Sequence, residues 1–434
     1  MERFLSQQLV LWKNEKERKP LILRGARQVG KSYLVRELGR SFSNFIEINF
    51  EMEPYLADIF SNSLDPKIII EKLSIARNIT ITPGETLLFF DEIQKVPNAI
   101  TALRYFYELL PELHIIAAGS LLDFVLEKIG MPVGRVSSMY VYPLSFKEFI
   151  IATGKEKLCG FIDRHNPEIP LDDLFFSQLT TLFSEYMAIG GMPEAVRSWL
   201  ENRDLKKVRK IHNDIIDTYR QDFIKYAKNQ QIHHVEKVFS VIPRMLGKKF
   251  IYSHIDESLK SREIKPALEL LEMAGIIHRI RHSSSNGVPL EAESNDTIFK
   301  TIFLDIGLSQ SLLGLSDGEW ILNIKNSVIN KGALVESFVG QEILAYSSPD
   351  SKKKLYYWVR EKTSAQAEID YVIEKDSTVI PVEVKSGTTG TLKSLIQFIK
   401  EKESVKYGIQ VSLKNFGSER NIRQIPLCAL WKIF

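Results

Sequence analysis

The chain has 434 residues, of which 44% are hydrophobic and 26% are charged; this balance excludes extensive disorder, because enough apolar surface is available for globular cores. The formal net charge of +3 excludes a strongly basic field, so any nucleic-acid-binding surface must be a local patch. The two cysteines, Cys159 and Cys428, exclude a disulfide framework and a cysteine-based zinc site.

The length and the apolar pattern predict a multidomain protein without membrane segments. A chain of this length is expected to form about two to four domains. Its start, MERFLSQQLVLWKNEKERKP, lacks the basic beginning and long apolar core of a signal peptide. No apolar run is long enough to span a bilayer. We therefore expect a cytoplasmic protein with no membrane partner.

Strands and helices are predicted to alternate along roughly the first third of the chain. Short apolar or alternating runs indicate the strands, and apolar residues at helical spacing indicate the helices. This alternation predicts a parallel sheet with right-handed crossovers, in which ligands bind at the carboxyl ends of the strands. The expected strands are 19–25, 44–51, 85–94, 113–120 and 137–149, the last closed by Pro143, and the expected helices are 31–42 and 98–110.

Three further regions are predicted after this alternating part. Helical spacing dominates from about 150 to 235, with an interruption at 189–196. Helices followed by a hairpin between about 236 and 305 suggest a winged helix. From about 330 the sequence predicts a helix, three strands, a helix and a strand, at 332–347, 354–361, 367–375, 379–387, 391–402 and 406–413.

The first chemical motif is RGARQVGKSY, residues 24–33. It fits the phosphate-binding pattern G-x-x-x-x-G-K-[ST], which requires a strand before it and a helix after it. Glycines let the backbone wrap closely around phosphates, and the N–H groups of the loop and helix start hold their charge. Lys31 would reach the β- and γ-phosphates, and Ser32 would bind Mg²⁺. The expected nucleotide-binding residues are Gly25, Ala26, Arg27, Gln28, Val29, Gly30, Lys31, Ser32 and Tyr33.

Two acids at the end of a later strand could hold the metal ion and act on the water that such a phosphate-binding site requires. The run LLFFDEIQ, residues 87–94, delivers Asp91 and Glu92 to the end of an apolar strand. Asp91 would hold Mg²⁺ through its water shell, and Glu92 would orient or deprotonate the attacking water. Taken alone, the first motif could be a glycine turn between a strand and a helix, and the two acids could belong to a solvated turn. Together the two motifs predict a nucleotide site with ATP and Mg²⁺ as cofactors.

Ser120 and Arg135 are candidate catalytic residues with open alternatives. Ser120 ends the strand LHIIAAGS, where it could touch the γ-phosphate or the water, or cap the following helix. Arg135 could act as an arginine finger, within the chain or from a neighbouring subunit. A plain surface arginine is the alternative reading of Arg135.

The motifs GARQVGKS, FFDEIQ, AAGS, GRVSSMYVYPLSFKEF and GGMPEAV resemble those of bacterial and archaeal P-loop ATPases of the AAA superfamily that carry an uncharacterised C-terminal domain of the DUF4143 type. The resemblance covers essentially the whole chain. It implies a helical lid after the ATPase core and then a winged helix. It also implies that Gly191, Met192 and Pro193 contact the base and sugar of the nucleotide, with Arg197 nearby. A simple helix break is the alternative reading of GGMP.

A second cluster of charged residues lies in EIDYVIEKDSTVIPVEVKSG, residues 368–387. Strand alternation places Glu383 and Lys385 on one face, and Asp370 can approach them across the hairpin. Two carboxylates and a lysine suit Mg²⁺-assisted phosphodiester hydrolysis, in which the acids hold the metal and the lysine positions water. An ordinary amphipathic hairpin with solvated charges is the alternative.

This spacing resembles the core of the PD-(D/E)xK nucleases, which include Holliday-junction resolvases and restriction enzymes. The resemblance implies a further acid from the preceding helix, and Glu336 in LVESFVGQE matches it. Ile369 stands where the family pattern has proline before Asp370. Glu368 is a possible extra ligand. The expected metal ligands of the chain are thus Ser32, Asp91, Glu336, Asp370 and Glu383.

Two stretches interleave basic and aromatic residues and could contact the phosphate backbone of DNA. They are residues 217–234 and 244–254, and a solvated helix face is the alternative, slightly favoured for the first stretch. His233 and His234 have no metal-site spacing and are expected to be ordinary core or surface histidines.

These observations predict an α/β protein: a P-loop AAA+ parallel-sheet core at 1–155, a helical lid at 156–235, a winged helix at 236–325 and a restriction-endonuclease-like α/β domain at 326–434. The expected function is ATP hydrolysis coupled to DNA binding, with possible metal-dependent DNA cleavage. The alternative is an ATP-dependent switch that binds DNA or a partner protein without cleavage. Assembly into a homo-oligomer is a further expectation.

Overall fold

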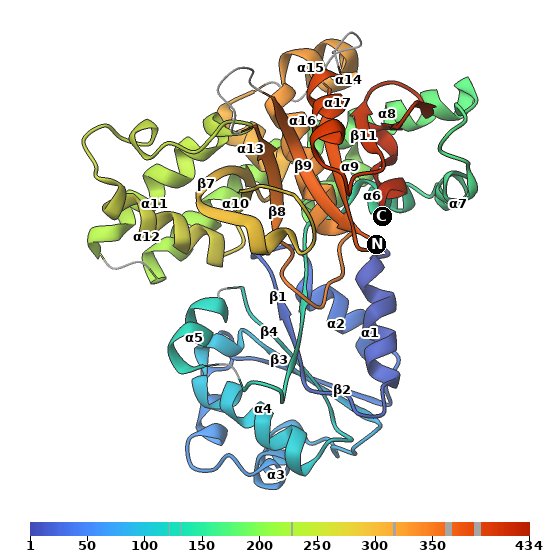
Figure 1. Cartoon of the computed structure of the whole chain (residues 1–434). Coiled ribbons are helices and arrows are strands. Elements are labelled where there is room, and N and C mark those ends of the chain that lie inside the picture. Colours follow the sequence, from blue (N-terminus) through green and yellow to red (C-terminus); the bar gives the residue numbers. More distant parts are fainter. Residues whose placement is uncertain (121, 131, 227–228, 316–317, 361–366, 386–391) are drawn as a thin grey trace. The chain divides into compact units, whose positions relative to one another are not determined.

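The computed structural model describes the chain except residues 121, 131, 227–228, 316–317, 361–366 and 386–391 (Figure 1). The described residues form two compact units. The first comprises Met1–Tyr142 and Ser348–Lys352, and the second comprises Pro143–Ser347 and Lys353–Phe434. None of the helices in the described part of the chain combines the length and apolar character needed to cross a membrane.

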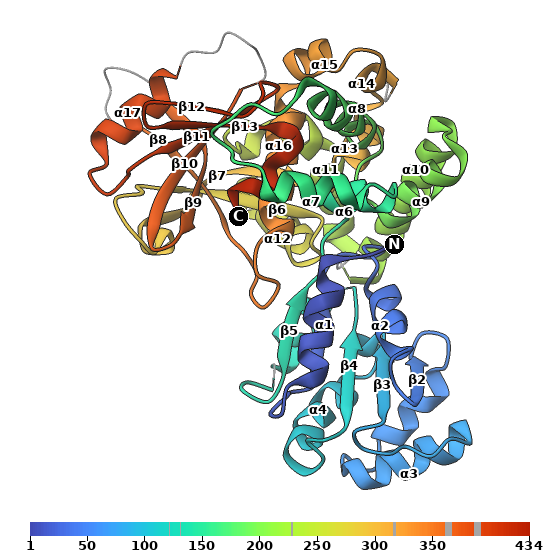
Figure 2. The ribbon, with the colours of Figure 1, turned by 90° about the vertical axis from the view of Figure 1, so that its right-hand side faces the viewer.

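The first unit is built on a five-stranded sheet in the order β2-β3-β4-β1-β5. Every pairing in it is parallel, as the alternation of strands and helices predicts, and Figure 2 shows the strands side by side. The carboxyl ends of the strands therefore meet at one edge. The strands are β1 (Leu21–Arg24), β2 (Asn44–Asn49), β3 (Thr86–Asp91), β4 (His114–Ala118) and β5 (Ser137–Tyr140).

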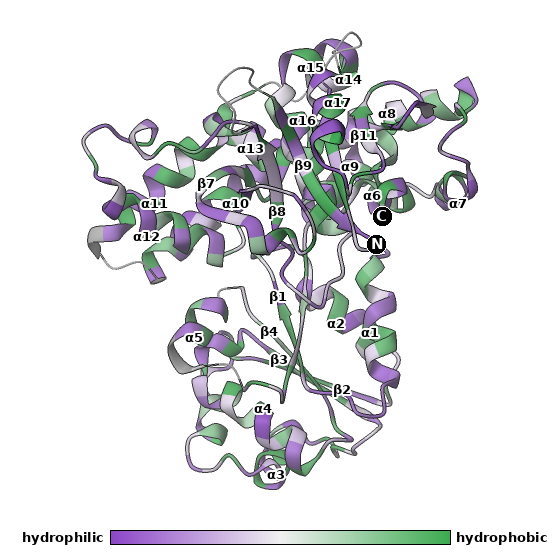
Figure 3. Ribbon diagram, viewed as in Figure 1, coloured by the Kyte–Doolittle hydropathy of each residue, from purple (hydrophilic) through white to green (hydrophobic). Residues whose placement is uncertain are grey.

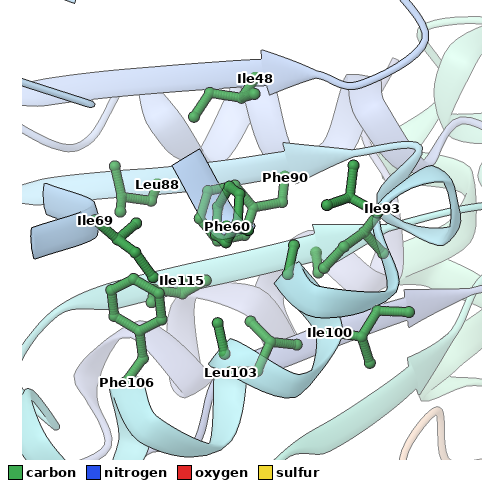
Figure 4. Close-up of a cluster of buried hydrophobic side chains, with 14 of the residues drawn as sticks. Ile48, Phe60, Ile69, Leu88, Phe90, Ile93, Ile100, Leu103, Phe106 and Ile115 are labelled. Atoms are coloured by element: carbon green, nitrogen blue, oxygen red, sulfur yellow. The ribbon is translucent and has the colours of Figure 1, made fainter. Parts of the chain in front are cut away.

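Buried apolar side chains hold helices against this sheet (Figure 4). Phe60 and Phe90 lie edge to face with ring centroids 5.7 Å apart, and Ile69 and Phe106 belong to the same buried cluster. Burying such side chains contributes about 1.5–3 kcal/mol each. The helices of this unit are α1 (Phe4–Asn14), α2 (Lys31–Gly39), η1 (Pro54–Phe60), α3 (Pro66–Arg77), η2 (Ile93–Lys95), α4 (Pro97–Leu109) and α5 (Leu122–Ile129).

A short segment from late in the sequence completes the first unit. Tyr140, the last residue of β5, donates its backbone N–H to the carbonyl oxygen of Pro349 at 2.9 Å. Ser348–Lys352 is thereby grouped with the parallel sheet, although about half of the chain separates this segment from β5 in the sequence.

Helices make up the beginning of the second unit, as predicted for 150–235. Figure 3 shows that helices such as α11 and α12 carry both hydrophobic and hydrophilic residues, the pattern of helices with one buried face. The helices of this unit are α6 (Phe146–Ala152), α7 (Glu156–Arg164), α8 (Asp173–Ile189), α9 (Pro193–Asn202), α10 (Leu205–Tyr226), α11 (Asn229–Val241), η3 (Ile242–Met245), η4 (Tyr252–His254), α12 (Ser261–Met273), η5 (Leu290–Glu293), α13 (Ile306–Leu313), α14 (Gly318–Leu322), α15 (Ile324–Asn330), α16 (Gly332–Ala345), α17 (Lys393–Glu401) and η6 (Leu427–Ile433).

The second unit also contains a mixed eight-stranded sheet in the order β12-β13-β11-β10-β9-β8-β6-β7. Its strands are β6 (Ile277–Ser283), β7 (Ser294–Phe303), β8 (Leu355–Val359), β9 (Glu368–Lys375), β10 (Thr378–Val384), β11 (Gly408–Ser412), β12 (Gly417–Glu419) and β13 (Ile422–Pro426). The last residues of the hairpin predicted at 368–387 lie outside the described residues.

The hairpin of the predicted winged helix is part of this same sheet. β6 and β7 pair antiparallel, and β6 also pairs with β8 in parallel, with Ile280 opposite Leu355. Helices do precede the hairpin, as predicted, but hydrogen bonding continues across the boundary placed at 325. The winged-helix and nuclease-like assignments and the finer domain boundaries remain predictions.

Candidate functional site

The predicted phosphate loop connects the end of β1 to the start of α2. Gly25 and Gly30 adopt left-handed backbone angles, φ 139° and 98°, and Gln28 has φ 65°. A Cβ atom on Gly25 would lie 2.2 Å from the carbonyl oxygen of Val141, so no other residue fits there without movement. Because α2 begins at Lys31, the unpaired N–H groups of its first turn face the end of this loop.

Lys31 is folded back over the loop. Its ammonium group donates to the carbonyl oxygens of Gly25 and Ala26 at 2.9 and 2.8 Å. Burial lowers the pKa of Lys31 to about 8, although the nearby carboxylates of Glu92 and Asp91 oppose this change. A bound anion would favour the charged form of this lysine.

Asp91 lies where the loop and three strand ends meet. Its Oδ2 atom accepts hydrogen bonds from the Ser32 hydroxyl at 2.9 Å and from the Asn49 side-chain amide at 3.3 Å. Burial raises the pKa of Asp91, while the hydrogen bond from Ser32 lowers it. The sequence motif predicts Ser32 and Asp91 but not Asn49; its position as the last residue of β2 is the signal that could have identified it.

Glu92 follows β3 directly and has a left-handed backbone, φ 53°. Its carboxylate accepts a hydrogen bond from the Gln94 side-chain amide, and burial raises the pKa of Glu92. Gln94 also packs against the end of β4, because a Cβ atom on Gly119 would lie 2.0 Å from Gln94 Oε1. Gln94 is thus a second residue of this site that the sequence motifs do not identify.

Ser120 is brought to this edge and Arg135 is not. Ser120 is buried and follows β4, whose Ala118 lies opposite Asp91. Arg135 precedes β5 and pairs with Glu108 at 2.8 Å. Since β5 begins opposite Leu21, the first residue of β1, Arg135 lies at the amino-end edge of the sheet, opposite the phosphate loop. Arg135 therefore does not lie where it could reach a nucleotide bound by its own loop. Its role as an arginine finger remains a prediction for a nucleotide bound by a neighbouring subunit.

Other residues support or flank the loop. Arg3 donates to the carbonyl oxygen of Val29 at 3.1 Å, which ties the first helix to the loop, and no motif indicates it. Arg27 lies 3.7 Å from Glu51. Tyr33 is exposed, and its hydroxyl accepts a hydrogen bond from the amino group of Met1 at 2.8 Å.

The GGMP segment is tightly packed within the second unit. Gly191 donates its N–H to Asp305 Oδ2 at 2.6 Å, and its carbonyl oxygen accepts from Leu144 N at 2.7 Å. Met192 is fully buried, and Pro193 begins α9. The segment thus breaks the helix between α8 and α9, which is the structural alternative for this motif. Contacts of Gly191, Met192 and Pro193 with a nucleotide remain a prediction.

The charged residues of the C-terminal region converge at one place in the second unit. Glu336 comes from α16, Asp370 from β9 and Glu383 from β10. Asp370 Oδ2 accepts the backbone N–H of Val384 at 2.7 Å, and Lys385 forms an ion pair with Glu383. Burial is the main cause that raises the pKa of Glu336, Asp370 and Glu383. The sequence correctly predicts that these side chains lie together.

A lysine that the sequence does not single out lies among these acids. Lys300, from β7, places its ammonium nitrogen 2.9 Å from Glu336 Oε1 and also forms an ion pair with Glu368. Its side chain is 3% exposed. Burial alone would lower the pKa of Lys300, but the charges of these acids outweigh it and raise that pKa.

Comparison with protein families identifies the first unit. Residues 17–150 match the model of the AAA domain. This match contains the phosphate loop, Asp91, Glu92 and Ser120. Residues 17–150 are a domain of the AAA type. The AAA-type assignment made from the motifs is confirmed, and so is the DUF4143 region, because residues 331–430 match that domain of unknown function. Residues 180–319 match a further domain of unknown function, DUF8612.

Individual relatives are distant. An uncharacterised protein of Haemophilus influenzae is 23% identical over 324 residues, which are 71% of this chain and 72% of that protein. The Walker-type ATPase PABY2304 of Pyrococcus abyssi is 16% identical, with a TM-score of 0.46, over 72% of this chain and 95% of its own. The ORC1 protein of Aeropyrum pernix, solved in complex with DNA, is 14% identical, with a TM-score of 0.30, over 71% and 90%.

The two clusters differ in how well they suit Mg²⁺. In the AAA domain, the Ser32 hydroxyl and Asp91 carboxylate are the hard oxygen ligands that this ion prefers, and they lie within 2.9 Å of each other. In the second unit, the ammonium of Lys300 already lies against the acids. Across the residues that the structure describes, no group of three or more His, Cys, Asp or Glu side chains could hold a metal ion.

The two basic stretches differ in the surroundings of their basic side chains. In 217–234, of which 227–228 lie outside the described residues, Arg220 pairs with Asp217 at 3.2 Å and with Glu236 at 2.9 Å. In 244–254, Arg244, Lys248 and Lys249 are exposed. His233 and His234 have ring centroids 6.4 Å apart.

Proposed function

We propose that the AAA domain binds and hydrolyses ATP with Mg²⁺. The observation that supports this most directly is the convergence of Lys31, Ser32, Asp91 and Glu92 at the helix start that follows the phosphate loop. Lys31 would leave the loop carbonyls and bind the β- and γ-phosphates, which stabilises the negative charge that develops there. The ion, when bound, supplies charge neutralisation on the phosphates, with Ser32 as a ligand and Asp91 acting through its water shell.

Glu92 is proposed to act as the base that orients and deprotonates the attacking water. Its raised pKa suits proton transfer, and the Gln94 amide holds its carboxylate in place. Asn49 would orient Asp91 in the same way. Ser120, at the end of the neighbouring strand, is proposed to contact the γ-phosphate or the water.

The proposal extends to the nucleotide base and to assembly. Gly191, Met192 and Pro193, with Arg197, are proposed to contact the base and sugar. Arg135 is proposed to act from a neighbouring copy in a homo-oligomer, which is consistent with its place at the sheet edge opposite the phosphate loop.

We further propose that the second unit binds DNA through its exposed basic stretch at 244–254. Of the two readings for its acidic residues, binding without cleavage is favoured over metal-dependent cleavage, because Lys300 pairs with Glu336 and Glu368. A partner protein in place of DNA predicts no salt-sensitive DNA binding.

Two assays test these proposals. Phosphate release from Mg²⁺–ATP should be measured for the whole chain and for Lys31→Ala, which should be inactive; absence of release and of calorimetric ATP binding by the whole chain would refute the first proposal. Labelled duplex, branched and single-stranded DNA should be incubated with Mg²⁺ or Mn²⁺, with Lys385→Ala as control. Cleavage that depends on metal and on Lys385 would overturn the non-cleaving reading.

A further inference from the structure

We propose that the ammonium group of Lys300 takes the place of a divalent metal ion among Glu336, Glu368, Asp370 and Glu383, here called the acidic cluster. The second unit would then carry a permanent ion network where the nuclease resemblance implies a metal centre. This inference uses contacts of the second unit alone, so it can fail or hold independently of ATP hydrolysis.

The position of Lys300 is that of a held cation. Its ammonium nitrogen is 2.9 Å from Glu336 Oε1 and pairs with Glu368, so it joins an acid of α16 to an acid of β9. The ring of Tyr357 lies on another side, with its centroid 5.3 Å from the nitrogen. Only 3% of the Lys300 side chain is exposed, whereas its partner Glu368 is 46% exposed, so the ammonium is buried at the edge of the cluster that Glu368 opens to solvent.

The other acids of the cluster are also engaged by the protein. Asp370 Oδ2 accepts the backbone N–H of Val384 at 2.7 Å, and Glu383 Oε1 pairs with Lys385. Glu383 Oε2 is buried and has no hydrogen-bond partner among the described residues. Each of these two acids thus has one oxygen engaged by a donor of the protein, and an octahedral Mg²⁺ or Mn²⁺ ion would have to compete with that donor.

Charge opposes a divalent ion at this place. The backbone of Gly247 lies beside one acid of the cluster, since a Cβ atom on it would be 3.0 Å from Glu336 Oε2. A divalent cation placed beside Lys300 would also face a like charge in a low-dielectric interior. Lys300 therefore neutralises the acids and joins α16, β7 and β9 without a metal.

The test measures Mn²⁺ binding to the whole chain without nucleotide. Every sample carries Asp91→Ala, so that the AAA domain does not contribute a metal site. The parent is compared with Lys300→Met, which keeps the length of the side chain without its charge, and with Lys300→Arg, which keeps the charge. Asp370→Asn is added to the parent and to Lys300→Met. Free Mn²⁺ is followed by electron paramagnetic resonance, and thermal unfolding is recorded with and without Mn²⁺.

We expect the parent and Lys300→Arg to show no Mn²⁺ binding that depends on Asp370. Lys300→Met should bind Mn²⁺ at least about tenfold more tightly than the parent, lose this binding when Asp370→Asn is added, and gain thermal stability from the ion. Parent binding that Asp370→Asn abolishes would overturn the proposal, as would a folded Lys300→Met that gains no Mn²⁺ affinity. If Lys300→Met does not fold, the comparison of the parent with Asp370→Asn still decides whether the acidic cluster binds Mn²⁺ while Lys300 is present.

Discussion

Glu92 combines three unusual properties at one residue. Its backbone is left-handed, its carboxylate is half-buried near Asp91 and Lys31, and its side chain is held by Gln94. Non-glycine residues with such backbone angles cost free energy and are concentrated at functional sites. The Glu92 carboxylate is also close enough to Lys31, the lysine of the phosphate loop, to interact with its charge.

Replacing Glu92 with glutamine should separate binding from chemistry. Glutamine keeps the size and hydrogen bonding of the side chain but cannot accept the proton of water, so hydrolysis should fall by about 10²- to 10⁴-fold. ATP affinity, measured by calorimetry, should stay close to that of the unchanged protein. Glu71→Gln, at an exposed position of α3, serves as the charge-matched control. Hydrolysis by Glu92→Gln at the unchanged rate would exclude Glu92 as the base.

Lys31 should make ATP binding sensitive to alkaline pH. Its pKa in the nucleotide-free protein is lowered to about 8, and the phosphates require its charged form. Affinity should therefore be full below this pKa and should fall as pH rises through it, since binding must then take up a proton. Calorimetry between neutral pH and pH values above the pKa, in buffers of different ionisation enthalpy, measures both affinity and proton uptake. A constant affinity with no proton uptake would contradict the lowered pKa.

At the scale of elements, the residue that follows β5 approaches the phosphate loop so closely that it restricts which amino acid can occupy position 25. Val141 N donates to the carbonyl oxygen of Arg24 at 2.8 Å, and the Val141 carbonyl oxygen fills the space where a side chain on Gly25 would be. The end of β1 is thus fixed by hydrogen bonding, and the loop turns away from it through left-handed angles. The same contact sets where the phosphate-binding N–H groups begin.

Gly25→Ala should lose both stability and ATP binding. The backbone angle alone costs about 1–3 kcal/mol for a non-glycine residue, and the collision with Val141 forces a shift of the loop. Gly84→Ala is the matched control, because Gly84 also has a left-handed backbone, φ 84°, but its Cβ position is open. Chemical denaturation should show a smaller loss for Gly84→Ala, with ATP affinity retained. Equal losses for the two variants would mean that the contact with Val141 does not restrict the loop.

At the scale of the whole molecule, chemistry is divided between two compact units. The AAA domain contains the proposed nucleotide site, while the second unit contains the mixed sheet, the acidic cluster and the exposed basic stretch. With a formal net charge of +3, the proposed DNA binding would depend on that local stretch and not on the overall field of the protein.

Removing the exposed basic residues should therefore reduce the salt dependence of DNA binding. Arg244→Ala, Lys248→Ala and Lys249→Ala combined should weaken binding and lower the slope of log affinity against log salt by about 1 for each phosphate that these side chains neutralise. Fluorescence anisotropy with labelled DNA at several salt concentrations measures this slope. A variant with Lys155, Lys157 and Lys206 changed to alanine, which are also exposed, is the control. Equal slopes for both triple variants would reject the assigned surface.

The phosphate loop could be predicted from the sequence because its residues are almost contiguous in the chain, so that a single turn of the backbone brings them together. Asn49 and Gln94 could not, since their roles depend on how strand ends meet across the sheet. The convergence of Asp370 and Glu383 follows from strand alternation within one hairpin. Lys300 could not be predicted, because a lysine on a strand ordinarily faces water and its partners are 36 and 68 residues away in the sequence.

The pairing of β6 with β8 has a practical consequence for anyone who expresses the DUF4143 region by itself. A fragment that starts at residue 331 lacks β6 and β7, so β8 would present an unpaired edge to solvent, and such edges attract other chains. The same cut removes Lys300 and leaves Glu336 and Glu368 without their buried counter-charge. Fragments designed from the family boundary should therefore aggregate, whereas those that begin before β6 retain the complete sheet.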